Sequence, residues 1–126
     1  LRLEFDDVTY GPEKCAEIGY RPPMVSDIQK LIEFLRGVKG PLLCHCAAGV
    51  SRSAAAAAIF VAMHTGPGQE LRVMRYIEKI RPIAFPNKRM IGLADRILGR
   101  GGKLLEASYK RFPQDEIDMA YTRDIG

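Results

Sequence analysis

The peptide LLCHCAAGVSRS, residues 42–53, joins an apolar run to a run of alanines. Its first residues, Leu42 to Cys44, are wholly apolar, which is typical of a strand at the centre of a parallel sheet. Residues 53–64 predict a helix whose small alanine side chains allow close packing. We therefore expect a strand, a turn at Cys46 and a helix. Three kinds of site fit this arrangement: a buried strand that contains cysteines, a metal site, or an anion-binding loop around a reactive thiol.

The turn between Cys46 and Arg52 has the features of an anion-binding loop. Gly49 can adopt a backbone conformation that other residues avoid, so the chain can curl back and point its N–H groups inward. The first turn of the following helix adds unpaired N–H donors and the positive end of its dipole. A thiol at the floor of such a loop should have its pKa lowered from about 8.5 to roughly 4–7. Arg52 offers a planar pair of donors for two oxygens of a phosphate.

A metal site lacks ligands in this sequence. Cys44 and Cys46 bring no second pair of cysteines, and His64 is the only histidine besides His45. Strand alternation also points Cys44 and His45 in opposite directions. We therefore predict no metal and no cofactor, with Cys44 in the core and His64 as a helix cap or surface residue. A redox partnership of Cys46 with Cys44, or with Cys15 as a backup thiol, stays open.

The remaining pattern predicts an α/β domain. Leu1, Leu3 and Phe5 alternate with polar residues, as in a strand with one buried face. Residues 9–23, rich in glycine, proline and charge, predict a surface loop. Helical spacing of apolar residues predicts further helices over residues 26–35 (N-capped by Ser26), 70–80, 88–98 and 104–111. This order indicates one domain, residues 1–126, with a central, mostly parallel sheet flanked by helices.

The pattern His-Cys-x-x-Gly-x-Ser-Arg-Ser at residues 45–53 resembles the signature of the cysteine-dependent protein tyrosine and dual-specificity phosphatases. The resemblance implies that Cys46 attacks phosphorus and forms a phosphocysteine, that Arg52 holds the transferred oxygens, and that Ser53 stabilises the leaving thiolate. His45 corresponds to the family's histidine that orders the loop. The phosphate would lie against the loop formed by Cys46, Ala47, Ala48, Gly49, Val50, Ser51 and Arg52.

Such chemistry needs a proton donor for the leaving group. In the resembling family this is an aspartate on a mobile loop just after an upstream strand. The apolar-x-apolar-x-Asp pattern of dual-specificity enzymes places Asp7 in this role, with Asp6 as the alternative. Both could also be ordinary residues at the end of a strand.

A third similarity lies in Arg-Pro-Ile-Ala-Phe-Pro-Asn, residues 81–87. Dual-specificity enzymes carry a similar Arg-Pro-x-x-x-Pro-Asn stretch, which packs beside the catalytic loop. We expect Asn87 to hold that loop or to position the attacking water. Lys88 and Arg89 would then extend a positive rim, or lie on a solvated helix face.

Composition narrows the setting and the partners. The formal net charge of +4 favours acidic partners, and the reactive loop selects phosphorylated molecules over nucleic acid. Three cysteines do not form a disulfide framework, so a cytoplasmic setting is expected. The longest apolar run is too short to cross a membrane, and no membrane partner is predicted. The absence of lysine from residues 47–51 favours a protein substrate over an inositol lipid, with phosphotyrosine first and phosphoserine or phosphothreonine as further candidates.

The chain also departs from the family pattern. Relatives carry strands before the acid-bearing one, and nothing here supplies them, so the domain is expected to be N-terminally incomplete or completed by a partner or by the C-terminal tail. An exposed sheet edge would then invite self-association.

The preferred function is a phosphatase acting through a phosphocysteine. The rivals are a pseudo-phosphatase that binds phosphorylated partners, and an arsenate reductase or sulfur transferase that uses the same loop.

Overall fold

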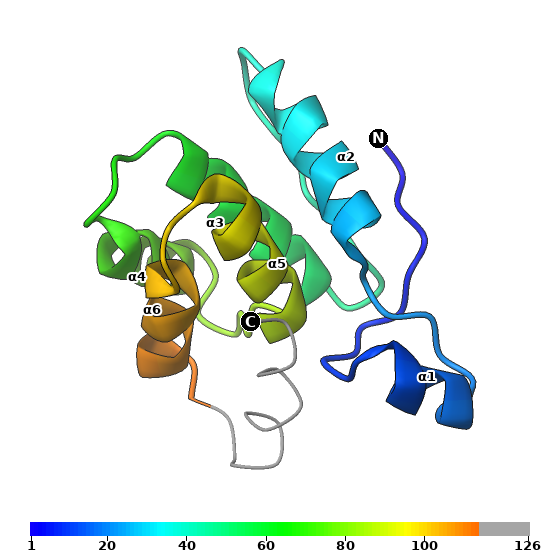
Figure 1. The fold of residues 1–126 in the computed structure, drawn as a ribbon. Coiled ribbons are helices and arrows are strands. Elements are labelled where there is room, and N and C mark those ends of the chain that lie inside the picture. Colours follow the sequence, from blue (N-terminus) through cyan, green and yellow to red (C-terminus); the bar gives the residue numbers. More distant parts are fainter. Residues whose placement is uncertain (114–126) are drawn as a thin grey trace.

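The computed structural model describes residues 1–113, and within them the regular structure is helical (Figure 1). The helices are α1 (Pro12–Ile18), α2 (Val25–Arg36), α3 (Arg52–Met63), α4 (Glu70–Ile80), α5 (Lys88–Leu98) and α6 (Lys103–Arg111). The helices predicted from periodicity, α2 to α6, are confirmed with ends that differ by at most one residue.

The predicted α/β fold is wrong for the described residues, which contain no strand and no sheet. Residues 1–5 and 42–46 carry the apolar patterns that predicted strands, yet no backbone hydrogen bond joins these two segments. Alternating apolar residues favour an extended chain, but a sheet also requires a neighbouring chain at hydrogen-bonding distance. Without a sheet in residues 1–113, self-association through a sheet edge loses its basis there. Completion by the tail concerns residues 114–126, which lie outside the described residues.

The segment predicted as a surface loop, residues 9–23, contains the short helix α1. Proline at its first position suits a helix start, and Gly19 ends it in the left-handed region at φ 80°. Cys15 was expected on the surface, but its side chain is fully buried and its thiol donates to the carbonyl of Tyr10. Helix α1 was missed because Cys15 is its only buried residue, and one apolar position gives no helical periodicity in the sequence.

The predicted N-cap at Ser26 is also wrong. Helix α2 begins at Val25, so Ser26 lies inside its first turn, and Met24 is the capping residue. The carboxylate of Asp27 accepts a hydrogen bond from the backbone N–H of Met24 at 2.9 Å. A side chain inside the first turn therefore secures the start of α2.

Helix α3 packs closely against its neighbours, as its small alanine side chains predicted. It packs against α2, α4 and α5, and α6 packs against α4 and α5. Ala55, Ala58 and Ala62 have no exposed surface, so neighbouring helices approach α3 closely. The core is one contiguous cluster drawn from these five helices and from Ala84 and Phe112, which follow α4 and α6.

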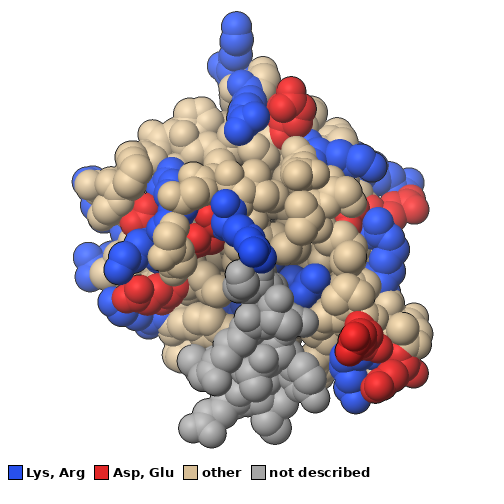
Figure 2. All heavy atoms as spheres, viewed as in Figure 1, with Lys and Arg blue, Asp and Glu red and all other residues tan. Residues whose placement is uncertain are grey.

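Two cations predicted at the surface lie inside the protein instead. Lys88 is completely buried: its ammonium donates to the carbonyl and hydroxyl oxygens of Ser108 at 2.8 and 2.7 Å, respectively. Arg89 is buried as well, and its Nε donates to the carbonyl of Pro23 at 2.8 Å. Neither residue forms a positive rim or a solvated face. On the face shown in Figure 2, basic and acidic side chains are interspersed, without a large block of one sign.

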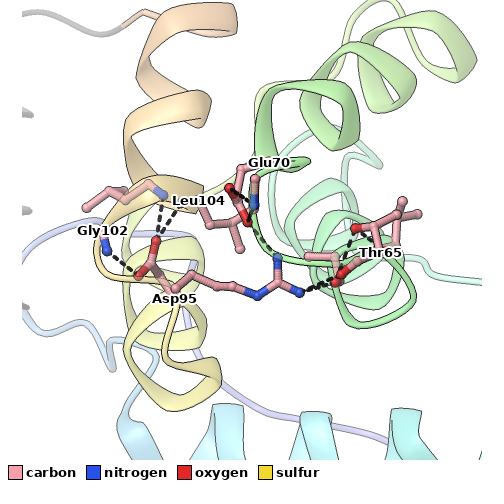
Figure 3. Close-up of polar contacts among 10 residues, drawn as sticks. Thr65, Glu70, Asp95, Gly102 and Leu104 are labelled. Atoms are coloured by element: carbon pink, nitrogen blue, oxygen red, sulfur yellow. Dashed lines mark hydrogen bonds and ion pairs between the residues drawn. The ribbon is translucent and has the colours of Figure 1, made fainter.

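Polar contacts fix the helix ends on the side of the core away from residues 42–53. Asp95 accepts from the backbone N–H groups of Gly102, Leu104 and Leu105, at the start of α6 (Figure 3). The guanidinium of Arg100 pairs with Glu70 at 2.7 Å, with both side chains at most 7% exposed. Arg100 also donates to the carbonyls of Ala62 and Thr65, so one side chain ties the end of α3 to the start of α4.

Within residues 1–113, no helix is long and apolar enough to cross a membrane.

Candidate functional site

The loop between Cys46 and Arg52 connects an extended segment to the first turn of α3. Gly49 adopts φ 68°, the left-handed conformation for which the sequence required a glycine. A Cβ atom at Gly49 would also lie 3.3 Å from a guanidinium nitrogen of Arg81. Both the backbone angle and the neighbouring side chain therefore favour glycine at this position.

The thiol of Cys46 lies where this loop converges on the start of α3. Its Sγ is 3.4 Å from the hydroxyl oxygen of Ser53. Partial burial alone would raise the pKa of this thiol. Hydrogen bonds from the Ser53 hydroxyl and from the N–H groups of Ser53, Gly49 and Val50 outweigh burial and lower the pKa of Cys46 from 9.0 to about 7. Near neutral pH, about half of the Cys46 population is therefore thiolate.

Cys44, two residues earlier, differs in its electrostatics. Its side chain is half-buried rather than in the core, and burial raises the pKa of its thiol. No disulfide links Cys15, Cys44 and Cys46. Only Cys46 combines partial exposure with a lowered pKa, which is the combination that makes a cysteine nucleophilic.

Arg52 joins the loop to the N-terminal segment. One terminal nitrogen of its guanidinium donates to the carbonyl of Phe5 at 2.8 Å. The Nε atom of Arg52 is buried and has no hydrogen-bond partner within residues 1–113. A buried donor without an acceptor is costly, and an anionic oxygen bound at the loop would supply one.

Asp7 is held next to the same loop. Its Oδ1 atom accepts from the hydroxyl of Ser51 at 2.7 Å and from the side-chain amide of Asn87 at 2.8 Å. Asn87 also donates to the carbonyl of Val8 at 3.1 Å. The contact from Ser51 was not predicted, because that residue had been assigned only to the phosphate-binding backbone. Asp7 therefore has a fixed orientation, and its second carboxylate oxygen carries no hydrogen bond within residues 1–113.

Asp6, the alternative acid, is used differently. Its Oδ2 accepts from the backbone N–H of Arg21 at 2.7 Å, and its own N–H donates to the carbonyl of Arg21. These bonds anchor the chain after α1. Asp6 thus holds the fold together, whereas Asp7 faces the loop.

The stretch of residues 81–87 packs beside the loop, as predicted, and contacts it at three points. The Nε of Arg81 donates to the carbonyl of Gly49 at 3.0 Å. Backbone N–H groups of Phe85 and Asn87 donate to the carbonyls of Val50 at 2.8 Å and Ser51 at 3.1 Å. Sequence reasoning did not single out Arg81 as a loop contact. These donors hold the loop through its carbonyls, while the N–H groups of Gly49 and Val50 bond to Cys46.

Asn87 has one further role, at the start of α5. Its Oδ1 accepts from the N–H of Met90 at 2.9 Å, so Asn87 is the N-cap of that helix. The same side chain therefore couples α5 to the acid-bearing segment.

The site opens into two separate cavities. Asp7, Ser51 and Asn87 line a cavity of about 270 Å³. Cys46, Arg52 and Ser53 line a larger one of about 680 Å³. The candidate acid contacts the loop at Ser51, whereas the candidate nucleophile contacts Ser53, so the two side chains line different cavities.

The two histidines have different outcomes. His45 is exposed and makes no hydrogen bond within residues 1–113, so its role in ordering the loop stays a prediction. His64 caps α3, with Nδ1 2.9 Å from the carbonyl of Phe60, as predicted. No group of three potential metal ligands (His, Cys, Asp or Glu) occurs in the described part of the chain.

No protein-family model, curated protein or solved structure matches this chain.

Proposed function

We propose that this protein hydrolyses phosphoric monoesters through a phosphocysteine at Cys46, as a protein tyrosine or dual-specificity phosphatase. The observation that carries the proposal is the lowered pKa of Cys46, about 7, caused by donors from Ser53, Gly49 and Val50. The same donors that stabilise a thiolate can stabilise the oxygens of a phosphate placed above it.

In the first step, the thiolate of Cys46 attacks phosphorus, so a P–S bond forms as the ester P–O bond breaks. The guanidinium of Arg52, through its unpaired Nε, and the N–H groups of residues 47–52 bind the three non-bridging oxygens. The leaving oxygen takes a proton from Asp7, which must enter this step as the carboxylic acid. The products are a free alcohol or phenol and the phosphocysteine.

In the second step, water attacks the phosphocysteine. Asp7, now a carboxylate, accepts a proton from that water as the P–S bond breaks. The Ser53 hydroxyl, 3.4 Å from Sγ, donates to the departing thiolate. Inorganic phosphate leaves, and the enzyme returns to its starting state.

Asp7 and Cys46 face different cavities, so the proposal requires the substrate to lie across Ser51, with its phosphate on Cys46 and its ester oxygen towards Asp7. A phosphotyrosine side chain, with phosphoserine or phosphothreonine as further candidates, is the proposed substrate class. The thiolate also needs a reducing compartment such as the cytoplasm to remain unoxidised.

Phosphate release from p-nitrophenyl phosphate tests the proposal, with the native chain and Cys46→Ser measured with and without a chelator. We expect turnover by the native chain that is insensitive to the chelator and is abolished by Cys46→Ser. Cys44→Ser is the matched control, because Cys44 has a raised pKa, and this variant should retain activity. Turnover that survives Cys46→Ser would overturn the proposal, and so would phosphate binding by the native chain without turnover.

A further inference from the structure

Lys88 is the only charged side chain within residues 1–113 that has no exposed surface. Both hydrogen bonds of its ammonium go to Ser108, and neither goes to a carboxylate. Burial lowers the pKa of Lys88 to about 7, so its surroundings disfavour the charge. A methionine of similar length would fill the same space without burying a charge. Packing alone therefore does not explain a lysine at this position.

The ammonium of Lys88 holds Phe85 against the end of helix α6. Its Nζ lies 5.1 Å from the centroid of the Phe85 ring, and 5.2 and 5.5 Å from those of Tyr109 and Phe112. Phe85 and Phe112 also meet edge to face, with centroids 6.4 Å apart. Because a cation is attracted to aromatic rings, removal of the charge would weaken the contacts of Phe85 as well as those of Ser108.

The residues next to this cation hold the candidate site directly. The backbone N–H groups of Phe85 and Asn87 donate to two carbonyls of the loop that carries Cys46, at 2.8 and 3.1 Å. The side-chain amide of Asn87 donates to the carboxylate of Asp7 at 2.8 Å. Lys88 thus fixes both ends of a four-residue segment that makes all three of these contacts.

We propose that Lys88 is a positioning residue for the candidate acid, Asp7. Its buried ammonium ties residues 85–87 to α6, and these residues in turn orient Asp7 beside the loop. The inference rests on the proposed phosphatase function, in which Asp7 protonates the leaving oxygen. Lys88 itself touches neither the substrate nor the reacting atoms.

The alternative is that Lys88 serves only to pack α5 against α6. A packing role predicts that any loss of turnover follows the loss of folded protein and is the same for every substrate. A positioning role predicts a loss that depends on the leaving group, because a misplaced acid matters most where the leaving oxygen needs a proton.

The main test compares kcat/KM of the native chain and Lys88→Met for phenyl phosphate and p-nitrophenyl phosphate. We expect a loss of about tenfold or more for phenyl phosphate and of about threefold or less for p-nitrophenyl phosphate, whose phenolate leaves with little help. Urea unfolding should show that Lys88→Met is no less stable than the native chain at the pH of the assay.

Arg100→Lys is the matched control on the other side of the core (Figure 3). Lysine keeps a cation beside Glu70 but loses the bonds of the guanidinium to the carbonyls of Ala62 and Thr65. This variant should be less stable than the native chain, yet its kcat/KM should change by the same factor for both substrates.

Two further variants connect Lys88 with its partners. Lys88→Met should cost no more than about twofold when it is added to Asp7→Asn, because an acid that is absent cannot be misplaced. Ser108→Ala keeps the ammonium and removes one of its acceptors. It should show a smaller loss with the same dependence on the leaving group, and it carries the test if Lys88→Met does not fold.

Amide hydrogen exchange separates this inference from the proposed function, because it does not depend on turnover. In Lys88→Met the amides of Phe85 and Asn87 should exchange faster by about tenfold or more, while amides inside α2 keep their native rates. If the native chain has no turnover, the proposed function fails and exchange alone decides on Lys88. The proposal is overturned if this exchange is unchanged, if both substrates lose kcat/KM equally, or if the losses of Lys88→Met and Asp7→Asn multiply in the double variant.

Discussion

The side-chain amide of Asn87 donates a hydrogen bond of 2.8 Å to the carboxylate of Asp7, across 80 positions of sequence. Together with the bond from Ser51, it fixes the candidate acid beside the loop that carries Cys46. The same Asn87 caps α5, so one side chain both orients the candidate acid and secures the start of this helix.

Two substitutions separate these two roles of Asn87. Serine retains an oxygen that can accept from the N–H of Met90, but it cannot reach Asp7 as the amide does. Asn87→Ser should therefore keep most of the stability and lose phosphatase turnover by about tenfold or more. Asn87→Ala should lose turnover similarly and also about 1 kcal/mol of unfolding free energy. Chemical denaturation and phosphate release measure the two effects. Equal turnover in Asn87→Ser and the native chain would contradict the role of Asn87 in positioning Asp7.

The two neighbouring aspartates give a matched pair for the acid. Asp7→Asn should reduce turnover by about 10²–10³, the usual contribution of a general acid. The loss should be larger for phenyl phosphate than for p-nitrophenyl phosphate, because nitrophenolate leaves with little need of a proton. Asp6→Asn removes a carboxylate that binds the backbone at Arg21 and should affect mainly stability. If Asp6→Asn lost more turnover than Asp7→Asn, Asp6 rather than Asp7 would be the general acid.

The buried ammonium of Lys88 predicts a pH dependence of stability. The rings of Phe85, Tyr109 and Phe112 lie 5.1 to 5.5 Å from it, and Ser108 accepts its hydrogen bonds. Burial lowers the pKa of Lys88 to about 7, whereas in the unfolded chain it is near 10.5. Between these values the unfolded state binds the extra proton, so this group makes stability rise with pH by up to about 1.4 kcal/mol per unit.

Lys88→Met removes this titration. Urea unfolding between pH 7 and pH 9 should show a shallower rise in stability for Lys88→Met than for the native chain. Lys79→Met is the control, because Lys79 is exposed and its loss should leave the slope unchanged. Parallel pH profiles for Lys88→Met and the native chain would show that Lys88 stays protonated inside the fold.

Helix positions could be predicted from the sequence because the apolar spacing in α2, α4 and α5 is a local signal that tertiary contacts reinforce. The sheet could not be, because alternation in residues 1–5 indicates an extended chain but not whether a neighbouring chain exists. The burial of Lys88 and Arg89 also escaped prediction. A charged side chain is usually expected to be solvent-exposed, and apart from Phe85 the groups around Lys88 (Ser108, Tyr109 and Phe112) are at least 20 residues away in sequence. The carbonyl that accepts from Arg89 belongs to Pro23, which is farther away still in sequence.

At the loop that carries Cys46, too, some features could be predicted from the sequence and others could not. Gly49 could be predicted because the turn needs a residue that tolerates positive φ, whereas Ser53 and Asn87 were expected near the loop only because their motifs resemble a known family. The contacts of Ser51 with Asp7 and of Arg81 with Gly49 could not, because they depend on how separate segments pack.

The ionisation of Cys46 is the claim that the rest of the functional account needs. The most direct measurement is the rate of carbamidomethylation of Cys46 by iodoacetamide from pH 5 to pH 10, followed by mass spectrometry so that Cys15 and Cys44 are counted separately. We predict a midpoint near pH 7 for Cys46, slower labelling in the presence of inorganic phosphate, and a midpoint shifted upward in Ser53→Ala, which lacks the hydroxyl donor. A Cys46 midpoint near 9, unaffected by phosphate and by Ser53→Ala, would contradict the account.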